Sequence, residues 1–229
     1  MNNGKYNLVA LLPMKEHSER VPGKNFKDLY GKPLYRWILD TLLKIEQIDL
    51  IVVNTDADNI LQEDPLLASN SRILIRKRKK ELEGDYVSMN RILEDDIEEI
   101  KSDLYLMTHV TNPLLSDSTV KSAIDSFMQA REKTSADSLF TVNRFQSRFY
   151  WKDGTAVNHD PDNLVPTQHL DPLFEENSNL YIFTRASFRK TSARIGKNPV
   201  MFETPRLESL DIDTMDDWDL VEKVAAPGK

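Results

Sequence analysis

Short apolar runs alternate with longer segments of helical periodicity along most of this chain. Such runs are typical of strands buried on both faces of a parallel sheet. They predict strands at residues 8–12, 50–54, 73–75, 104–108, 139–142 and 180–184. Between them, apolar residues recur every three or four positions, which predicts helices at residues 34–45, 87–101, 120–128 and 218–224. Strands that alternate with helices indicate an α/β fold with a mostly parallel sheet.

The pattern breaks between residues 143 and 175. This stretch has three prolines, scattered aromatic residues and little periodicity. A segment of this length without clear elements is usually a functional excursion or an interface. We therefore predict a single domain over residues 1–229, with 143–175 as an inserted segment.

Composition narrows the class of protein. The 229 residues include no cysteine, which excludes disulfides and thiol catalysis and fits a reducing cytoplasm. No apolar run reaches the length of a membrane span, and the N-terminus lacks the apolar core of a signal peptide. The net charge of −7 argues against general nucleic-acid binding, so an anionic ligand must meet a local basic patch.

A basic loop follows the first predicted strand. It carries the cations Lys15, Arg20 and Lys24, together with the polar residues Ser18 and Asn25, and a helix signal comes next. A strand, a basic loop and a helix in this order are typical of a phosphate site at the carboxyl edge of an α/β sheet. The loop matches neither a Walker A nor a Gly-x-Gly-x-x-Gly pattern. The alternative is a solvated connector that happens to be basic.

Other polar groups also follow predicted strands. Asp56 follows the second strand, where its expected role is to cap the next helix. Five consecutive cations, residues 76–80, follow the third strand. Such a run usually forms a solvated face, but its place at the same sheet edge favours a second basic wall for phosphates.

Two carboxylates near the C-terminus, Asp211 and Asp213, are spaced so that extended backbone would point both to one side. Mg²⁺ favours one or two carboxylates completed by phosphate oxygens and water. The alternative is that Asp213 caps the last helix and Asp211 is a solvated charge.

The segment Pro13-x-Lys15-x-x-Ser18-x-Arg20-Val21-Pro22-Gly23-Lys24-Asn25, followed by Gly31-Lys32-Pro33-Leu34, resembles the signature loop of the acylneuraminate cytidylyltransferases, the CMP-sialic acid synthetases. Family members usually read Pro-Ala-Arg-x-x-Ser-Lys-x-x-Pro-x-Lys-Asn there, so Lys15 replaces an arginine and Glu19 a lysine. The block Asp-Ile-Asp-Thr at residues 211–214 resembles the metal signature of the family. With further blocks, the resemblance covers essentially the whole chain.

The resemblance implies a three-layer, Rossmann-like nucleotidyltransferase that joins CTP to a sialic-acid-like 2-keto-3-deoxy sugar acid and releases pyrophosphate. It implies Mg²⁺ on Asp211 and Asp213, and cytosine recognition near Arg78. The expected contacts of the triphosphate and nucleotide are Lys15, Ser18, Arg20, Lys24, Asn25 and Thr111, of which Lys15 and Lys24 also count as catalytic. No single general base is indicated: His109 and a metal-bound hydroxide are both candidates.

On the acceptor side, the resemblance implies contacts from His109, Gln168 and Asn177, and a homodimer in which segment 143–175 packs across to the partner. His109 stands where the family has Gln. Two basic positions of the family fall on Thr167 and Trp151, and Lys152, Arg144 and Arg148 lie close enough in the sequence to substitute for them.

Two alternatives follow from these departures. One is a nucleotidyltransferase of the same fold with another acceptor, such as a sugar phosphate or a different nonulosonic acid. The other is a non-catalytic nucleotide-binding homologue. In either case the expected partners include neither nucleic acid nor membrane.

Overall fold

The first apolar run forms β1 (Tyr6–Leu11), an interior strand of a seven-stranded sheet in the computed structural model, which describes residues 6–226. The strand order is β5-β4-β1-β6-β8-β7-β9. The other strands are β4 (Leu50–Thr55), β5 (Ile73–Lys77), β6 (Ser102–Thr108), β7 (Ser138–Phe145), β8 (Leu173–Thr184) and β9 (Pro199–Glu203). Strand β8 is antiparallel to both of its neighbours and the remaining adjacent pairs are parallel, which confirms the mostly parallel sheet.

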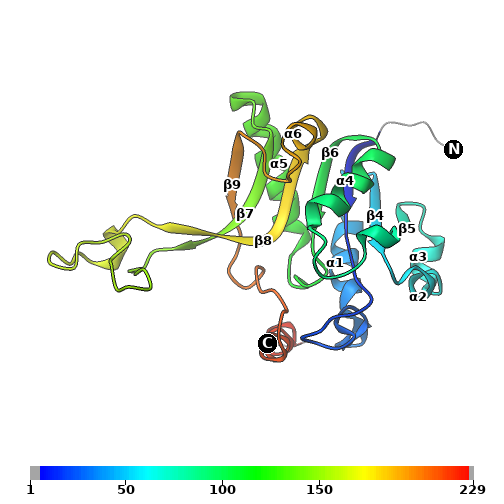
Figure 1. Ribbon diagram of the computed structural model, residues 1–229, viewed down its shortest axis with the longest axis horizontal. Helices are drawn as coiled ribbons and strands as arrows, with labels where there is room; N and C mark the ends of the chain where they lie inside the picture. Colours follow the sequence, from blue (N-terminus) through cyan, green and yellow to red (C-terminus); the bar gives the residue numbers. More distant parts are fainter. Residues whose placement is uncertain (1–5, 227–229) are drawn as a thin grey trace.

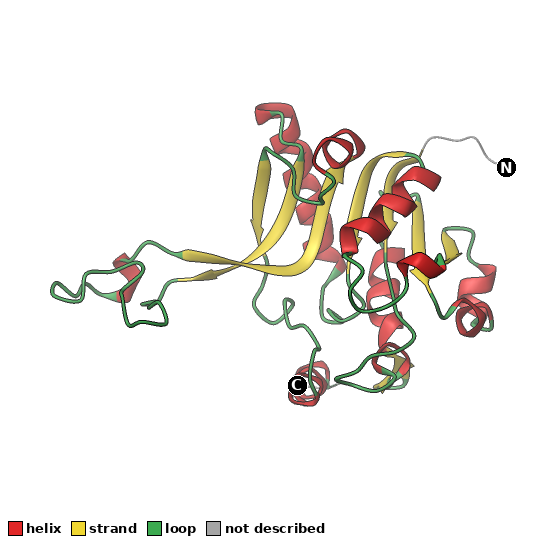
Figure 2. Ribbon diagram, in the orientation of Figure 1, coloured by secondary structure: helices red, strands yellow, loops and turns green. Residues whose placement is uncertain are grey.

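Helices cover both faces of the sheet and complete three layers (Figures 1 and 2). Alternate residues of β1 explain this, because Leu8 and Ala10 join one buried cluster while Val9 and Leu11 join the other. The first cluster includes side chains of α1 and α5, and the second includes side chains of α4 and α6. The helices are α1 (Leu34–Leu43), α2 (Asp58–Gln62), α3 (Pro65–Ser69), α4 (Met89–Glu99), α5 (Asp117–Thr134), α6 (Arg185–Thr191) and α7 (Met215–Ala225).

Short elements complete the chain. They are the 3₁₀ helices η1 (Lys24–Phe26), η2 (Lys80–Leu82) and η3 (Thr167–His169), and the small hairpin of β2 (Asp28–Leu29) and β3 (Lys32–Pro33). None of these was predicted. The hairpin turn is built from Tyr30 and Gly31, which both have positive φ. Among residues 6–226, no helix is long and apolar enough to cross a membrane.

Pro13 does not end the pairing between the first two predicted strands. The Leu12 N–H donates to Val52 O at 2.8 Å and the Met14 N–H donates to Asn54 O at 2.9 Å, on either side of the proline. Successive residues of a strand point their N–H groups to opposite sides, so the missing donor of Pro13 falls on the side away from β4. The chain therefore stays paired with β4 as far as the start of the basic loop.

Most predicted helices are present, with shifted ends. Ser116 caps α5 by accepting from the Thr119 N–H. Met128, the last apolar residue of the helix predicted at 120–128, is 38% exposed. The sequence pattern also missed α6 and β9. Helix α6 is only seven residues long, and β9 is an edge strand whose residues alternate between exposed and partly buried, so neither produces a continuous apolar run.

Strands β7 and β8 extend beyond the sheet as a long twisted hairpin (Figures 1 and 2). Their pairing continues to Phe145 and Leu173, so the irregular part is 146–172 rather than the predicted 143–175. We call residues 146–172 the arm. The strand pairing carries the arm away from the body of the molecule, and the short helix η3 lies within it.

Candidate active site

A cleft of about 400 Å³ opens where the chain leaves the carboxyl ends of β1 and β6. This is the edge at which open α/β sheets bind ligands. The structure brings seven of the predicted site residues together in its walls: Lys15, Ser18, Arg20, Lys24, Asn25, His109 and Thr111. The wall also contains His17, Glu19, Asp85 and Met89, which were not predicted.

The basic loop is fixed in shape by its own backbone and by two polar side chains. Gly23 adopts a left-handed conformation with φ of 62°, which lets the chain turn into η1. The Asn25 side chain donates to Lys15 O at 2.7 Å, and the Glu16 N–H donates to the Asp56 carboxylate at 2.7 Å. Asp56 therefore ties the loop to the end of β4. Its predicted role as a helix cap is wrong, because α2 is preceded by Ala57 and has no side-chain cap.

Each cation of the loop meets a carboxylate. Lys15 Nζ lies 2.6 Å from Asp85 Oδ1, and Arg20 Nη2 lies 2.8 Å from Asp213 Oδ1. Lys24 is buried, donates to Ile212 O and lies 3.6 Å from Asp213. Carboxylate and phosphate oxygens accept the same hydrogen bonds from cations. Phosphate oxygens could therefore accept hydrogen bonds from these three cations in place of the carboxylates.

The acidic pair does not itself line the cleft, but it lies against residues that do, namely Arg20, Lys24 and Thr111. The Ile212 N–H donates to Thr111 O at 3.0 Å, and the Thr111 hydroxyl hydrogen-bonds the Asp211 carboxyl. Thr214 caps α7 in a reciprocal arrangement with Asp217, so the alternative of Asp213 as the cap is wrong.

The pair has the chemistry of a partial cation site. Burial raises the pKa of the Asp211 carboxyl, and the neighbouring Asp213 charge adds to this. A divalent cation would relieve that repulsion, and two carboxylates plus phosphate oxygens suit Mg²⁺. Among residues 6–226, no group of three or more His, Cys, Asp or Glu is arranged to hold a metal ion. A metal here would thus depend on the bound nucleotide for further ligands.

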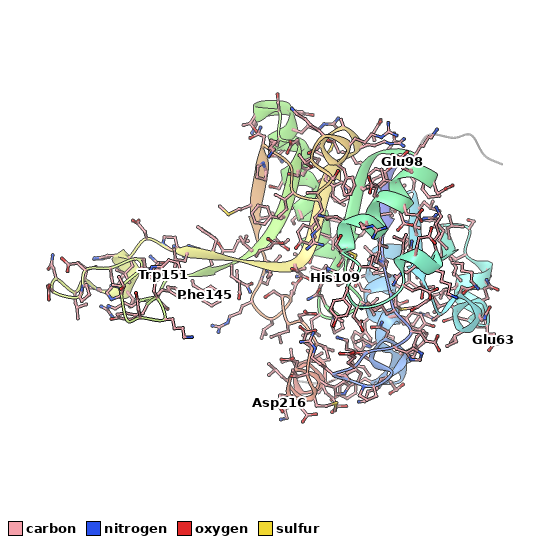
Figure 3. All side chains as sticks on the ribbon, viewed as in Figure 1. Glu63, Glu98, His109, Phe145, Trp151 and Asp216 are labelled. Atoms are coloured by element: carbon pink, nitrogen blue, oxygen red, sulfur yellow. The ribbon has the colours of Figure 1, made fainter. Side chains whose placement is uncertain are left out.

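His109 lies at the inner end of the cleft, in the body of the molecule (Figure 3). Burial lowers the pKa of its imidazole to about 4, and the charges of Arg194 and Lys24 act in the same direction. The ring is therefore neutral near pH 7. A neutral imidazole accepts a hydrogen bond, but a group with this pKa is a weak base.

The second basic stretch does not form a phosphate wall. Arg76 pairs with Asp95 and Asp96, Lys79 pairs with Asp95, and Lys77 lies 3.4 Å from Asp58. These acidic residues come from α4 and α2, so the charge of the run is largely compensated within the protein. The predicted second wall for phosphates is wrong, and none of residues 76–80 lines the cleft.

Arg78, the third residue of this run, is buried beneath the basic loop. It donates to Asn54 Oδ1 at 2.9 Å, to Met14 O at 3.0 Å and to Asn54 O at 2.8 Å. Met14 lines the cleft, whereas Arg78 does not. Arg78 therefore supports the cleft wall from below, and its direct contact with a cytosine base stays a prediction.

The other predicted acceptor contacts lie outside the cleft. Gln168 belongs to η3 in the arm. Asn177 donates to Asn143 and to Thr204, which holds β8 against its neighbours. Arg144 lines a separate hollow and donates to Gln146. No residue of these three approaches the cleft of its own subunit in residues 6–226.

Cations at the carboxyl ends of parallel strands can bind a triphosphate, and an acidic pair beside them can hold a divalent cation. This combination suits a nucleotidyltransferase. A family model described as Cytidylyltransferase matches residues 9–225. This chain therefore belongs to the cytidylyltransferase family, and it is an enzyme of the nucleotidyltransferase class.

Three named relatives are similar over nearly all of the chain. A pseudaminic acid cytidylyltransferase of Campylobacter jejuni is 25% identical, covering 93% of this chain and 94% of its own. A CMP-N,N'-diacetyllegionaminic acid synthase of Legionella pneumophila is 24% identical, covering 95% of both. An N-acylneuraminate cytidylyltransferase of Oncorhynchus mykiss is 28% identical over 96% of this chain, which spans 50% of that protein.

Solved structures support the fold. A CMP:2-keto-3-deoxy-manno-octonic acid synthetase complexed with CTP matches with a TM-score of 0.66 at 15% identity, covering 95% of this chain and 98% of that one. A 4-diphosphocytidyl-2C-methyl-D-erythritol synthase from Anaerococcus prevotii matches with a TM-score of 0.66 at 11% identity, covering 95% of both. Both matches support the α/β fold that the sequence pattern indicates.

Proposed function

We propose that this enzyme transfers CMP from CTP to the anomeric hydroxyl of a sialic-acid-like 2-keto-3-deoxy sugar acid and releases pyrophosphate. The observation that carries the proposal is the convergence of Lys15, Arg20 and Lys24 on one cleft. Asp213 pairs with two of these cations, and Asp211 hydrogen-bonds Thr111 of the cleft wall. The names of the relatives support a nonulosonic acid as the acceptor, since three different acids of that kind occur among them.

We assign each residue of the cleft a role from its position. The loop cations bind the triphosphate in place of the carboxylates that they now hold, and they neutralise charge on the transferring and leaving oxygens. Asn25 and Asp56 hold the loop in the shape that makes this possible. His109, being neutral, accepts a hydrogen bond from the attacking hydroxyl and orients it.

Mg²⁺ is the metal that we propose for Asp211 and Asp213. When bound there with the nucleotide, it would supply positive charge to the α-phosphate oxygens. The supporting observation is the raised pKa of Asp211 beside a second carboxylate, because a cation would remove this repulsion.

We also propose a homodimer formed through the arm. Apolar side chains of the arm face solvent in a single subunit, Tyr150 at 55%, Trp151 at 64% and Leu164 at 60% exposure. Exposed apolar clusters of this kind usually mark interfaces. Light scattering at micromolar concentration tests it, and a monomer there would contradict it. We propose the cytoplasm as the place of action, where CTP is available.

The test of the reaction is pyrophosphate release from CTP and Mg²⁺ with a panel of acceptors. We expect release with at least one nonulosonic acid and none with sugar phosphates. Release only with a sugar phosphate would favour another acceptor class. CTP binding without release for any acceptor would favour a non-catalytic homologue.

A further inference from the structure

A second hollow, of about 360 Å³, adjoins the cleft. It lies between the start of α4 and the loop after α6, and Met89 lines both spaces. Its polar wall contains Arg194, Glu176 and Asn90. No residue of this hollow was predicted as a site residue. Because it shares a wall with the cleft, it can hold a second substrate beside the nucleotide.

The guanidinium of Arg194 is held in place by Tyr181, but few of its N–H donors make hydrogen bonds within the protein. Its Nη2 donates to Tyr181 Oη at 3.2 Å, and its guanidinium lies 4.2 Å from the centre of the Tyr181 ring. The nearest carboxylate oxygen, on Glu176, is 3.9 Å away and is itself hydrogen-bonded to Tyr181. The bond to Tyr181 is the one hydrogen bond of this guanidinium within residues 6–226, so most of its five N–H donors are available to a ligand.

Arg194 also lies beside the cleft, because the hollow that it lines shares Met89 with the cleft that His109 lines. The charge of Arg194 accordingly lowers the pKa of His109. In a 2-keto-3-deoxy acid, the carboxylate carbon is bonded directly to the anomeric carbon. A cation that binds this carboxylate must therefore be adjacent to the hydroxyl that attacks phosphorus. The hollow that Arg194 lines offers such a position, because it adjoins the cleft.

The cations that were predicted as site residues in the cleft and at the hairpin are placed for other contacts. Lys15, Arg20 and Lys24 are directed to the phosphate positions. Arg144 lines a hollow of its own at the base of the hairpin. The arm extends away from the cleft, with Trp151 on it far from His109 in Figure 3.

We propose that Arg194 binds the carboxylate of the acidic sugar acceptor, and that the adjoining hollow is the acceptor pocket. This inference rests on the proposed function. It assigns the carboxylate to a residue of the same subunit, in a chain where the arm carries Thr167 and Trp151 at the positions expected to be basic. Hydrogen bonds from planar guanidinium groups to carboxylates are often bidentate, which fixes the orientation of the acid as well as binding it.

The rest of the pocket suits the polar groups of such an acceptor. The Asn90 side-chain oxygen is buried and has no hydrogen-bond partner within residues 6–226. An unpaired buried polar atom is costly, so a hydroxyl or N–H of the ligand would satisfy it. Glu176 offers a carboxylate for a second hydroxyl of the sugar.

The test compares Arg194→Gln and Arg194→Lys with a matched control, Arg189→Gln. Arg189 lies on the exposed side of α6, where it pairs with Glu98 at 2.9 Å. The acceptor identified in the panel and its methyl ester, which lacks the negative charge, are assayed at saturating CTP. The KM for CTP and the thermal midpoint are measured for every variant.

We expect Arg194→Gln to raise the KM for the acid about tenfold to a hundredfold, the effect of losing charge-assisted hydrogen bonds. The KM for CTP should stay within about twofold, because the phosphate cations are untouched. Wild type should prefer the acid to the ester, Arg194→Gln should lose that preference, Arg194→Lys should keep part of it, and Arg189→Gln should behave as wild type.

An unchanged acid-to-ester preference in Arg194→Gln would overturn the assignment while leaving the reaction established. If wild type releases no pyrophosphate with any sugar acid, the proposed function fails and this inference fails with it. A lower thermal midpoint of Arg194→Gln would not by itself produce the expected result. Only the loss of a carboxylate contact changes the discrimination between acid and ester.

Discussion

Two basic segments of this chain follow parallel strands at the same edge of the sheet, yet only one builds a cleft. Residues 15–24 place three cations around an open space, and Arg20 is 63% exposed there. Residues 76–80 meet the acidic side chains of α4 and α2, and Arg78 is enclosed by backbone carbonyls. Carboxylates pair with cations in both segments, so neither the number of cations nor their pairing separates the two. The difference is position: residues 15–24 line the open cleft, whereas none of residues 76–80 does.

The largest expected effect is that of Asp211→Asn. Asparagine keeps the shape but loses the charge that would attract a cation, so turnover should fall about a hundredfold or more. The thermal midpoint should be unchanged or slightly higher, since Asp211 and Asp213 no longer repel each other. Asp216→Asn, an exposed carboxylate in the first turn of α7, is the matched control and should be near wild type. Normal turnover in Asp211→Asn would exclude the acidic pair from the reaction.

A direct comparison of the two basic segments is Arg20→Gln against Lys79→Gln. Both side chains are exposed and each is paired with one aspartate. We expect Arg20→Gln to weaken CTP binding about tenfold, the worth of a hydrogen bond to a charged group, and Lys79→Gln to change it less than about twofold. Equal losses in calorimetric titrations would show that the difference between the segments does not govern nucleotide binding.

Asp56→Ala tests how far the shape of the loop matters. The change leaves the Glu16 N–H without its partner, a loss of about 1 kcal/mol for an ordinary hydrogen bond. The KM for CTP should therefore rise about fivefold, with little change in the KM for the acceptor. If Asp56→Ala behaves as wild type in steady-state kinetics, the loop keeps its shape without this tether.

The remaining prediction concerns stability rather than activity, and its variable is pH. The pKa of His109 is lowered to about 4 in the folded protein, against about 6.5 in an unfolded chain. The unfolded state therefore takes up a proton first, and the folded protein loses stability as pH falls from about 6.5 towards 4. His109→Gln should lose less stability over this range in denaturant titrations at pH 7.5 and 5.0. The same loss in both proteins would mean that His109 is not held neutral.

The sheet, its order of elements and the basic loop were predictable because buried strands and amphipathic helices leave regular apolar patterns. The arm was recognised by the absence of such a pattern, although β7 and β8 extend further into the predicted segment 143–175 than expected. Edge strand β9 and short helix α6 were missed because they bury few side chains.

The cations and the acidic pair of the candidate site could be predicted because they lie in contiguous sequence motifs. Asp85, Asp56 and Arg194 were missed or misread, since their partners are far along the chain and appear only on folding. The prediction of a phosphate wall at residues 76–80 failed for the same reason. Nothing in that run indicates that Asp95 and Asp96 will face it. Contacts between distant segments set the local charge, and no single segment reveals them.

The central claim is that the cleft around Lys15, Arg20 and Lys24 binds cytidine triphosphate. Calorimetric titration of the wild-type protein with CTP, UTP, ATP and GTP in the presence of Mg²⁺ tests it most directly. We predict that CTP binds more tightly than the other three. Tighter binding of ATP than of CTP would contradict the account.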